Sequence, residues 1–119
     1  MPLNYTIHSR KSQGAGGQEL KQIVPVLLQK YVPIVGKAPK EWRIRNMKTR
    51  WGTCNTVTRK IWLNLELAKK PAECLEYVLL HELAHLRVPN HGKDFYEVLD
   101  CHMPDWKERK NLLNGRRSG

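Results

Sequence analysis

Two histidines and a glutamate stand together in the run His81-Glu82-Leu83-Ala84-His85. Residues four apart lie on one face of a helix, so two imidazoles at this spacing can coordinate one zinc ion. Glu82 follows the first histidine directly and would project beside the metal, where it could take a proton from a water that the metal activates. The run therefore predicts a metal-dependent hydrolase with His81 and His85 as metal ligands and Glu82 as catalytic base.

Apolar residues flank this run, with Tyr77-Val78-Leu79-Leu80 before it and Leu86 after it. A helix buried among such neighbours does not ordinarily contain two imidazoles and a carboxylate, because burying them without partners costs several kcal/mol. A bound metal ion removes that cost. The context therefore favours a metal site over a surface helix that carries polar residues by chance.

A catalytic zinc ion needs a third protein ligand and one open position. His91 is the first candidate, because Pro89-Asn90 turns the chain out of the helix and lets His91 return to the metal. The three histidines have the spacing of the metzincin signature, although Val88 stands where that signature has glycine. Glu97 is the second candidate, by analogy with zinc peptidases whose third ligand is a downstream glutamate, and Asp94 is a weaker one.

The spacing of apolar residues predicts the elements that hold these side chains. One helix, a few strands and then further helices follow one another, an order typical of an α+β domain. The polar stretch Asn55–Lys60 suggests a hairpin between two of the strands. The predicted elements are a helix over residues 18–35, strands at 42–45, 51–54 and 61–65, the metal-binding helix between Pro71 and Pro89, and helices over 95–101 and from Pro104 toward Leu113.

The length of 119 residues suits one domain, which we expect over residues 18–113. Residues 1–17 end in a glycine-rich stretch typical of a flexible segment, and residues 114–119 are expected to be a disordered tail. Three widely spaced cysteines argue against a disulfide framework or a thiolate zinc site. No run is apolar enough to span a membrane and no signal peptide is visible, so a cytoplasmic location is expected.

Several stretches in combination carry a family resemblance: residues 44–55, 61–65 and 75–85, then Asn90-His91-Gly92 through Phe95, and finally residues 102–106. Together they resemble the YgjP-like metallopeptidase domain, which is related to the WLM and SprT-like zinc peptidases. The resemblance covers about residues 18–113. It implies a zincin-like core, in which a small antiparallel or mixed sheet packs on the zinc helix, with His81, His85 and His91 as zinc ligands and Glu82 as base. Relatives usually have a β-rich region before this domain, for which residues 1–17 are too short.

Peptide-bond hydrolysis is the leading expectation, with a peptide or protein as the substrate partner. Such substrates pair with a sheet edge, and Ile61–Leu65 is predicted to be that edge. One alternative is a hydrolase of a nucleotide phosphoanhydride, although the chain has no phosphate-binding glycine loop. A second is a protease that acts on DNA-bound proteins, since a net charge of +10 attracts nucleic acid. The third is a zinc-stabilised binding module, for which Cys101 is the only conceivable fourth ligand.

Overall fold

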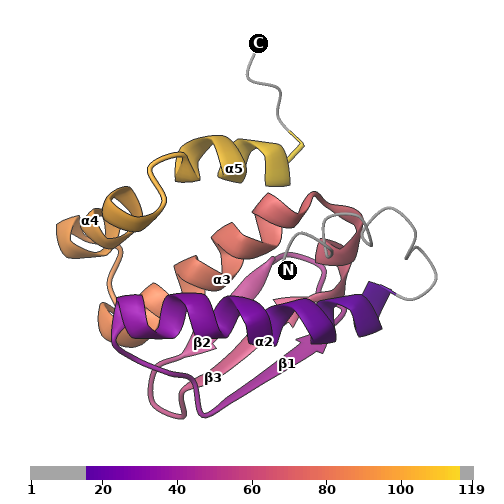
Figure 1. The fold of residues 1–119 in the computed structure, drawn as a ribbon, viewed down its shortest axis with the longest axis horizontal. Helices are drawn as coiled ribbons and strands as arrows, with labels where there is room; N and C mark the ends of the chain where they lie inside the picture. Colours follow the sequence, from indigo (N-terminus) through magenta and orange to yellow (C-terminus); the bar gives the residue numbers. More distant parts are fainter. Residues whose placement is uncertain (1–15, 116–119) are drawn as a thin grey trace.

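Four α-helices and a three-stranded sheet make up residues 16–115, the part of the chain that this computed structural model describes (Figure 1). The elements are α2 (Gly16–Val35), β1 (Glu41–Arg45), β2 (Gly52–Asn55), β3 (Lys60–Asn64), the 3-10 helix η2 (Leu65–Lys69), α3 (Ala72–Arg87), α4 (Lys93–His102) and α5 (Trp106–Leu113). The predicted α+β class is confirmed. The predicted flexible segment and tail lie outside the described residues, except that Gly16 and Gly17 begin α2 and that Asn114 and Gly115 form a turn after α5.

The central strand of the sheet is β3, and the strand order is β1-β3-β2. It pairs in parallel with β1 and antiparallel with β2, so the sheet is mixed and β2–β3 is the predicted hairpin. The prediction that Ile61–Leu65 is a free edge is wrong. Residues 60–64 pair on both sides, and Leu65 already begins η2. In the described part of the chain, the edges of the sheet are β1 and β2.

Side chains of β3 alternate between two faces of the sheet. Ile61 and Leu63 are fully buried, whereas Lys60 and Trp62 lie on the opposite, more open face. The helices α2 and α3 pack side by side on the buried face, and α4 and α5 lie on α3, away from the sheet (Figure 1). The helix that carries the predicted catalytic run therefore lies at the centre of the molecule, between the sheet and the C-terminal helices.

The long helix α2 supplies one wall of the core. Four of its side chains are buried at helical spacing: Leu20, Val24, Leu27 and Tyr31. The helix stops at Gly36, as predicted, with a φ of +87° that favours glycine. At this end the Arg87 guanidinium donates a hydrogen bond of 2.9 Å to the Val35 carbonyl oxygen, which joins the last turns of α2 and α3.

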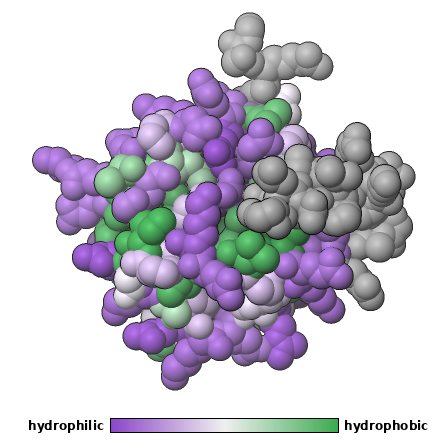
Figure 2. Space-filling model, in the orientation of Figure 1, coloured by the Kyte–Doolittle hydropathy of each residue, from purple (hydrophilic) through white to green (hydrophobic). Residues whose placement is uncertain are grey.

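Hydrophilic side chains cover most of the face shown in Figure 2, with separate apolar patches between them. This agrees with a chain in which 27% of the residues are charged. Within residues 16–115, none of the helices has the length and apolar character needed to cross a membrane.

Candidate metal centre and active site

The helix α3 holds all residues of the predicted catalytic run. Leu79, Leu80 and Leu83 of this helix are fully buried, which fixes its rotation in the core. His81 and His85 then lie on one side of the helix, with Glu82 beside them. The His81 side chain is 24% exposed and that of Glu82 only 7%. The carboxylate is thus nearly enclosed, whereas the imidazole of His81 reaches solvent.

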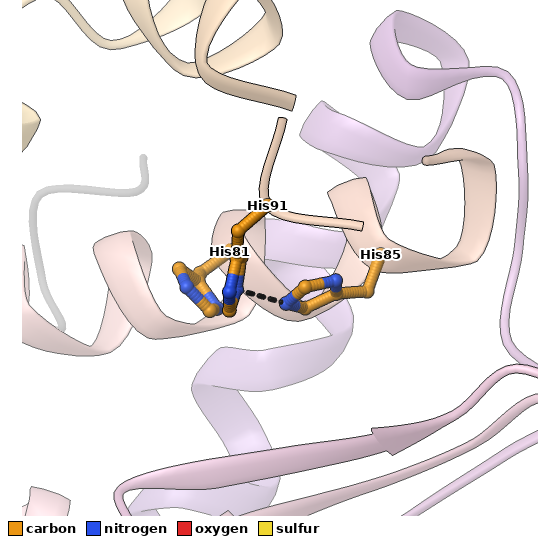
Figure 3. A group of neighbouring side chains, drawn as sticks. All are labelled: His81, His85 and His91. Carbon is orange, nitrogen blue, oxygen red and sulfur yellow. Dashed lines mark hydrogen bonds between the residues drawn. The ribbon is translucent and has the colours of Figure 1, made fainter. Parts of the chain in front are cut away.

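His91 lies in the loop of residues 88–92, between α3 and α4, and its ring turns toward the two helix histidines (Figure 3). Its Nε2 lies 2.8 Å from Nε2 of His85. One ring nitrogen from each of the three histidines lies within 4.8 Å of the others. Val88 needs no glycine conformation here, because its φ of −128° is that of extended chain. The loop therefore brings His91 to the site without the glycine of the metzincin signature.

The three imidazoles fit a zinc ion in number, type and spacing. Two nitrogens that bind one tetrahedral zinc ion at about 2.0–2.1 Å lie roughly 3.3 Å apart. The nitrogens of His85 and His91, at 2.8 Å, are already near that separation. Three nitrogen ligands without a thiolate are typical of a catalytic zinc site, in which the fourth position stays open. Within residues 16–115, no cysteine, aspartate or glutamate joins this group of potential ligands.

A backbone carbonyl orients His85. Its Nδ1 lies 3.1 Å from the carbonyl oxygen of Pro89, so the Nδ1–H donates and Nε2 keeps its lone pair on the side of His91. Burial lowers the pKa of His85, and the neighbouring His81 lowers it further. Since only neutral imidazole binds a metal ion, both effects prepare His85 as a ligand at neutral pH.

Phe95, on the first turn of α4, packs against all three imidazoles. The distances from its ring centroid are 5.0 Å to His81, 4.6 Å to His85 and 4.9 Å to His91. Its side chain is fully buried, so it provides a fixed surface against which the three rings lie. The sequence placed Phe95 in a helix but gave it no function. Its position shortly after His91, at the start of the next helix, was the feature of the sequence that could have indicated contact with the metal site.

Glu82 lies beside a cavity of about 190 Å³. The cavity is lined from three elements and the loop before β2, by Arg50, Trp51, Gly52, Tyr77, Val78, His81, Glu82, Lys110, Leu113 and Asn114. Burial, with the charge of Glu82, raises the pKa of Tyr77 to about 12, so its hydroxyl keeps its proton at neutral pH. The Oε2 of Glu82 lies 3.4 Å from Nδ1 of His81. The carboxylate, one of the histidines and an open cavity are therefore in direct contact.

The loop before β2, which forms one wall of this cavity, is held by the buried side chain of Asn64. Its Nδ2 donates to the carbonyl oxygens of Met47 (2.9 Å) and Arg50 (2.7 Å). Its Oδ1 accepts from the backbone N–H groups of Met47 (3.3 Å) and Glu66 (3.0 Å). All hydrogen-bonding capacity of the carboxamide is used. This function could not be predicted from the sequence, because an asparagine at the end of a strand has many possible hydrogen-bond partners.

The other candidates for ligands lie elsewhere. Asp94, Glu97, Cys101 and His102 line a second cavity, together with the ends of α2 and α3, and they do not belong to the group of three histidines. Cys101 is therefore not placed as a fourth ligand. Tyr96 is partly exposed, and its ring lies 6.3 Å from that of His91 and stacks on Trp106. It belongs to an aromatic cluster at the edge of the site.

This arrangement brings three imidazole nitrogens and one nearly enclosed carboxylate to a cavity that a substrate can enter. The chemistry available to such groups is hydrolysis assisted by a metal ion. The protein therefore belongs to the class of metal-dependent hydrolases.

Comparison with known proteins narrows this class. The chain belongs to the family of the YgjP-like metallopeptidase domain, whose sequence profile matches residues 8–116. It is thus a zinc-dependent metallopeptidase, as the sequence predicted. No curated protein matches the chain.

Two solved structures have a similar fold. The metallopeptidase zymogen abylysin of Pyrococcus abyssi has 24% identity and a TM-score of 0.67, over 79% of this chain and 97% of that one. The metallopeptidase zymogen jannalysin of Methanocaldococcus jannaschii has 20% identity and a TM-score of 0.67, over 77% of this chain and 88% of that one. At such identities the likeness concerns the fold.

Proposed function

We propose that His81, His85 and His91 hold the zinc ion of this peptidase and that Glu82 is its general base. The observation that carries the proposal is the approach of three imidazole nitrogens to within 4.8 Å of one another, beside an almost enclosed carboxylate. A hydrogen bond between the Nε2 atoms of His85 and His91 accounts for one of these approaches, whereas a common metal ligand accounts for the convergence of all three imidazoles.

When bound, zinc supplies a Lewis acid that polarises the substrate carbonyl and makes a water acidic enough to lose a proton near pH 7. Glu82 accepts that proton at a carboxylate oxygen and later returns it to the leaving amine. The enclosed position of Glu82 limits competition from bulk water for this proton. Phe95 and the Pro89 carbonyl keep the imidazoles oriented while this happens.

The free edge of β2 supports a strand-like position for the substrate. The Asn64 N–H donates a hydrogen bond to the Trp51 carbonyl oxygen, and in an antiparallel pair every second residue bonds to the neighbouring strand. The backbone N–H and C=O groups of Gly52 and Cys54 therefore point away from β3, toward the open edge of β2. Gly52 also borders the cavity at Glu82. A substrate paired with this edge would pass the base. Peptides N-methylated at successive positions test this: KM should rise only at alternate positions, and a uniform effect along the peptide would contradict it.

Hydrolysis of an unfolded protein by the zinc-loaded chain tests the assignment of Glu82. We expect cleavage by the parent and none by Glu82→Gln, which keeps the shape of the side chain and removes the base. The matched control is Glu66→Gln, at a partly exposed glutamate paired with Lys69, which should leave cleavage unchanged. Cleavage of nucleoside triphosphates but not of peptides would mean that the same zinc site hydrolyses the alternative class of substrate, a nucleotide phosphoanhydride.

Nucleic acid is a further proposed partner, which would direct the peptidase to proteins bound on it. The net charge of +10 supports a polyanionic partner. If this is right, added DNA should accelerate cleavage of a DNA-binding protein at low salt but not cleavage of a free peptide. Equal rates with and without DNA would contradict it.

We also propose a cytoplasmic location. Cys54, Cys74 and Cys101 are all unpaired, which suits a reducing compartment. Fractionation of cells that express the tagged protein tests this, and recovery from an oxidising compartment would contradict it.

A further inference from the structure

The face of the sheet opposite the helices carries an unusual group of side chains, which we call the outer sheet face: Glu41, Arg43 and Arg45 of β1 and Lys60 and Trp62 of β3. Neighbouring strands place paired residues on the same face, and the register pairs Glu41 with Lys60 and Arg43 with Trp62. The alternate residues Ile61 and Leu63 are fully buried toward the helices. The outer sheet face therefore follows directly from the register of two strands.

This face is open in the described part of the chain. The Arg43 side chain is 62% exposed, that of Lys60 is 37% exposed, and Arg45 is also exposed. The helices lie on the other face, and Gly52 of β2 points toward them, against Val78 and Glu82. The outer sheet face and the catalytic carboxylate are thus on opposite sides of the same sheet.

Cations surround the indole of Trp62. The guanidinium carbon of Arg45 lies 5.0 Å from the ring centroid of Trp62, and Nζ of Lys60 lies 5.7 Å from it. Glu41 is the single acid of the group and pairs with both Arg43 and Lys60, which leaves an excess of positive charge. Ion pairs alone do not account for a partly exposed indole at the centre of this face.

More cations extend the group beyond both ends of the paired strands. Lys40 and Arg59 meet at one end, where the Lys40 N–H donates to the Arg59 carbonyl oxygen at 2.8 Å. Lys48 follows the other end, in the loop that the side chain of Asn64 holds. A track of positive charge thus runs along the strands with one flat aromatic ring near its middle.

We propose that the outer sheet face binds single-stranded nucleic acid, with phosphates on Arg43, Arg45 and Lys60 and bases stacked on the flat surface of Trp62 and Arg45. Cations that follow a backbone and an aromatic ring that stacks bases are the combination that recognises single strands without regard to sequence. An acidic peptide would use the cations but not the flat surface. A duplex keeps its bases stacked inside and would also use the cations alone.

This binding face rests on the proposal of a nucleic-acid partner and does not depend on the zinc site. It can therefore be measured on Glu82→Gln protein, in which peptide hydrolysis is expected to be lost. The probe is a fluorescently labelled 20-nucleotide thymidine strand, and the reading is its anisotropy at several salt concentrations. A hairpin duplex of the same charge is the competitor.

Trp62→Thr, which keeps a β-branched residue in the strand, should weaken binding of the labelled strand at least tenfold. Arg45→Lys keeps the charge and removes the planar surface, so affinity should fall while the salt dependence stays the same. Arg43→Gln should reduce the slope of log affinity against log salt by about one phosphate contact. The matched control is Lys107→Gln on α5, which removes the same charge and a similar contact of 5.6 Å with Trp106 and should change nothing.

Four results would overturn the inference. An equal loss in the Lys107 control would mean that only the total charge matters. Unchanged binding by Trp62→Thr and Arg45→Lys, or a duplex that competes as well as a single strand, would mean that the bases are not stacked. Absence of any binding at low salt would refute both nucleic acid as a partner and the outer sheet face as its binding site. The peptide assay would still test the zinc site separately.

Discussion

Gly52 at the start of β2 lies directly against the side chain of Glu82. A Cβ at position 52 would come to 3.1 Å from Oε2 of Glu82 and to 2.8 Å from Cγ1 of Val78. Contacts as short as 2.8 Å are not tolerated, so glycine is required for β2 to approach α3 this closely. The close contact between the sheet and the Glu82 side chain thus depends on the absence of a Cβ atom at position 52.

This contact predicts that Gly52→Ala lowers kcat by displacing the Glu82 carboxylate. The Cβ contact of 3.1 Å requires the carboxylate to move by a few tenths of an ångström, so kcat should fall by less than the roughly 100-fold that a 1 Å displacement can cost. The matched control is Gly92→Ala, where a Cβ would meet nothing within 4 Å. Peptide hydrolysis by the two zinc-loaded variants provides the measurement. Equal activities would show that Glu82 is free to move aside without consequence.

The choice of third ligand predicts different zinc affinities for two variants. His91→Ala should weaken zinc binding at least tenfold, because one of three nitrogens is lost, whereas Glu97→Ala should not change it. Competition with a chromophoric chelator measures both. Removal of zinc from the parent should also lower Tm, since the ion binds only the folded state. A larger loss in the Glu97 variant would reassign the ligand.

The four hydrogen bonds of Asn64 predict that Asn64→Asp is strongly destabilising. The aspartate loses both donors and places its charge against the Met47 and Arg50 carbonyl oxygens. The expected loss is roughly 2–4 kcal/mol in the free energy of unfolding, measured with urea. Asn55→Asp is the control, because Asn55 only accepts, from the N–H groups of Val57 and Thr58, and should stay within about 0.5 kcal/mol. Equal losses would refute the account.

The ion pairs of Glu76 are expected to make the protein less stable toward unfolding in acid. Burial acts to raise the pKa of its carboxyl, but the hydrogen bonds from Arg109 and Lys30 outweigh burial and hold the pKa below its ordinary value of 4.5. A lowered folded-state pKa stabilises the protein above pH 4.5, and this contribution disappears as the pH falls through the folded-state value. The unfolding free energies of parent and Glu76→Gln should therefore converge in acid. A difference that stays constant with pH would contradict the prediction.

The cysteines predict selective labelling in the native protein. Burial, with the charge of a neighbouring glutamate, raises the pKa of both Cys54 and Cys74 to about 11, whereas Cys101 is exposed. At pH 8 a thiol of pKa about 11 is ionised in roughly one molecule in a thousand, and only the thiolate reacts. Maleimide followed by peptide mapping should find Cys101 alone, and Cys101→Ser should react only after urea is added. Fast labelling of Cys54 would contradict its enclosure.

The sequence by itself determined the local part of the site. The spacing of His81 and His85 and the place of Glu82 depend only on the period of a helix, which neighbouring residues set. The apolar positions around them fixed which side of that helix is buried, and the limits of α2 and α3 followed from Gly36, Pro71 and Pro89 within a few residues. Family membership also followed from the sequence, because its motifs are local strings.

Only the tertiary structure decided the parts that join distant segments. Strand order depends on which strands pair, and one strand can form hydrogen bonds equally well with several others. The alternation in Ile61–Leu65 therefore could not show that β3 is the central strand and that β1 and β2 are the edges. The position of His91, the packing of Phe95 against three imidazoles and the contact of Gly52 with Glu82 likewise depend on how α4 and β2 pack on α3. Helical period is a property of consecutive residues, whereas these contacts exist only once the whole core has closed.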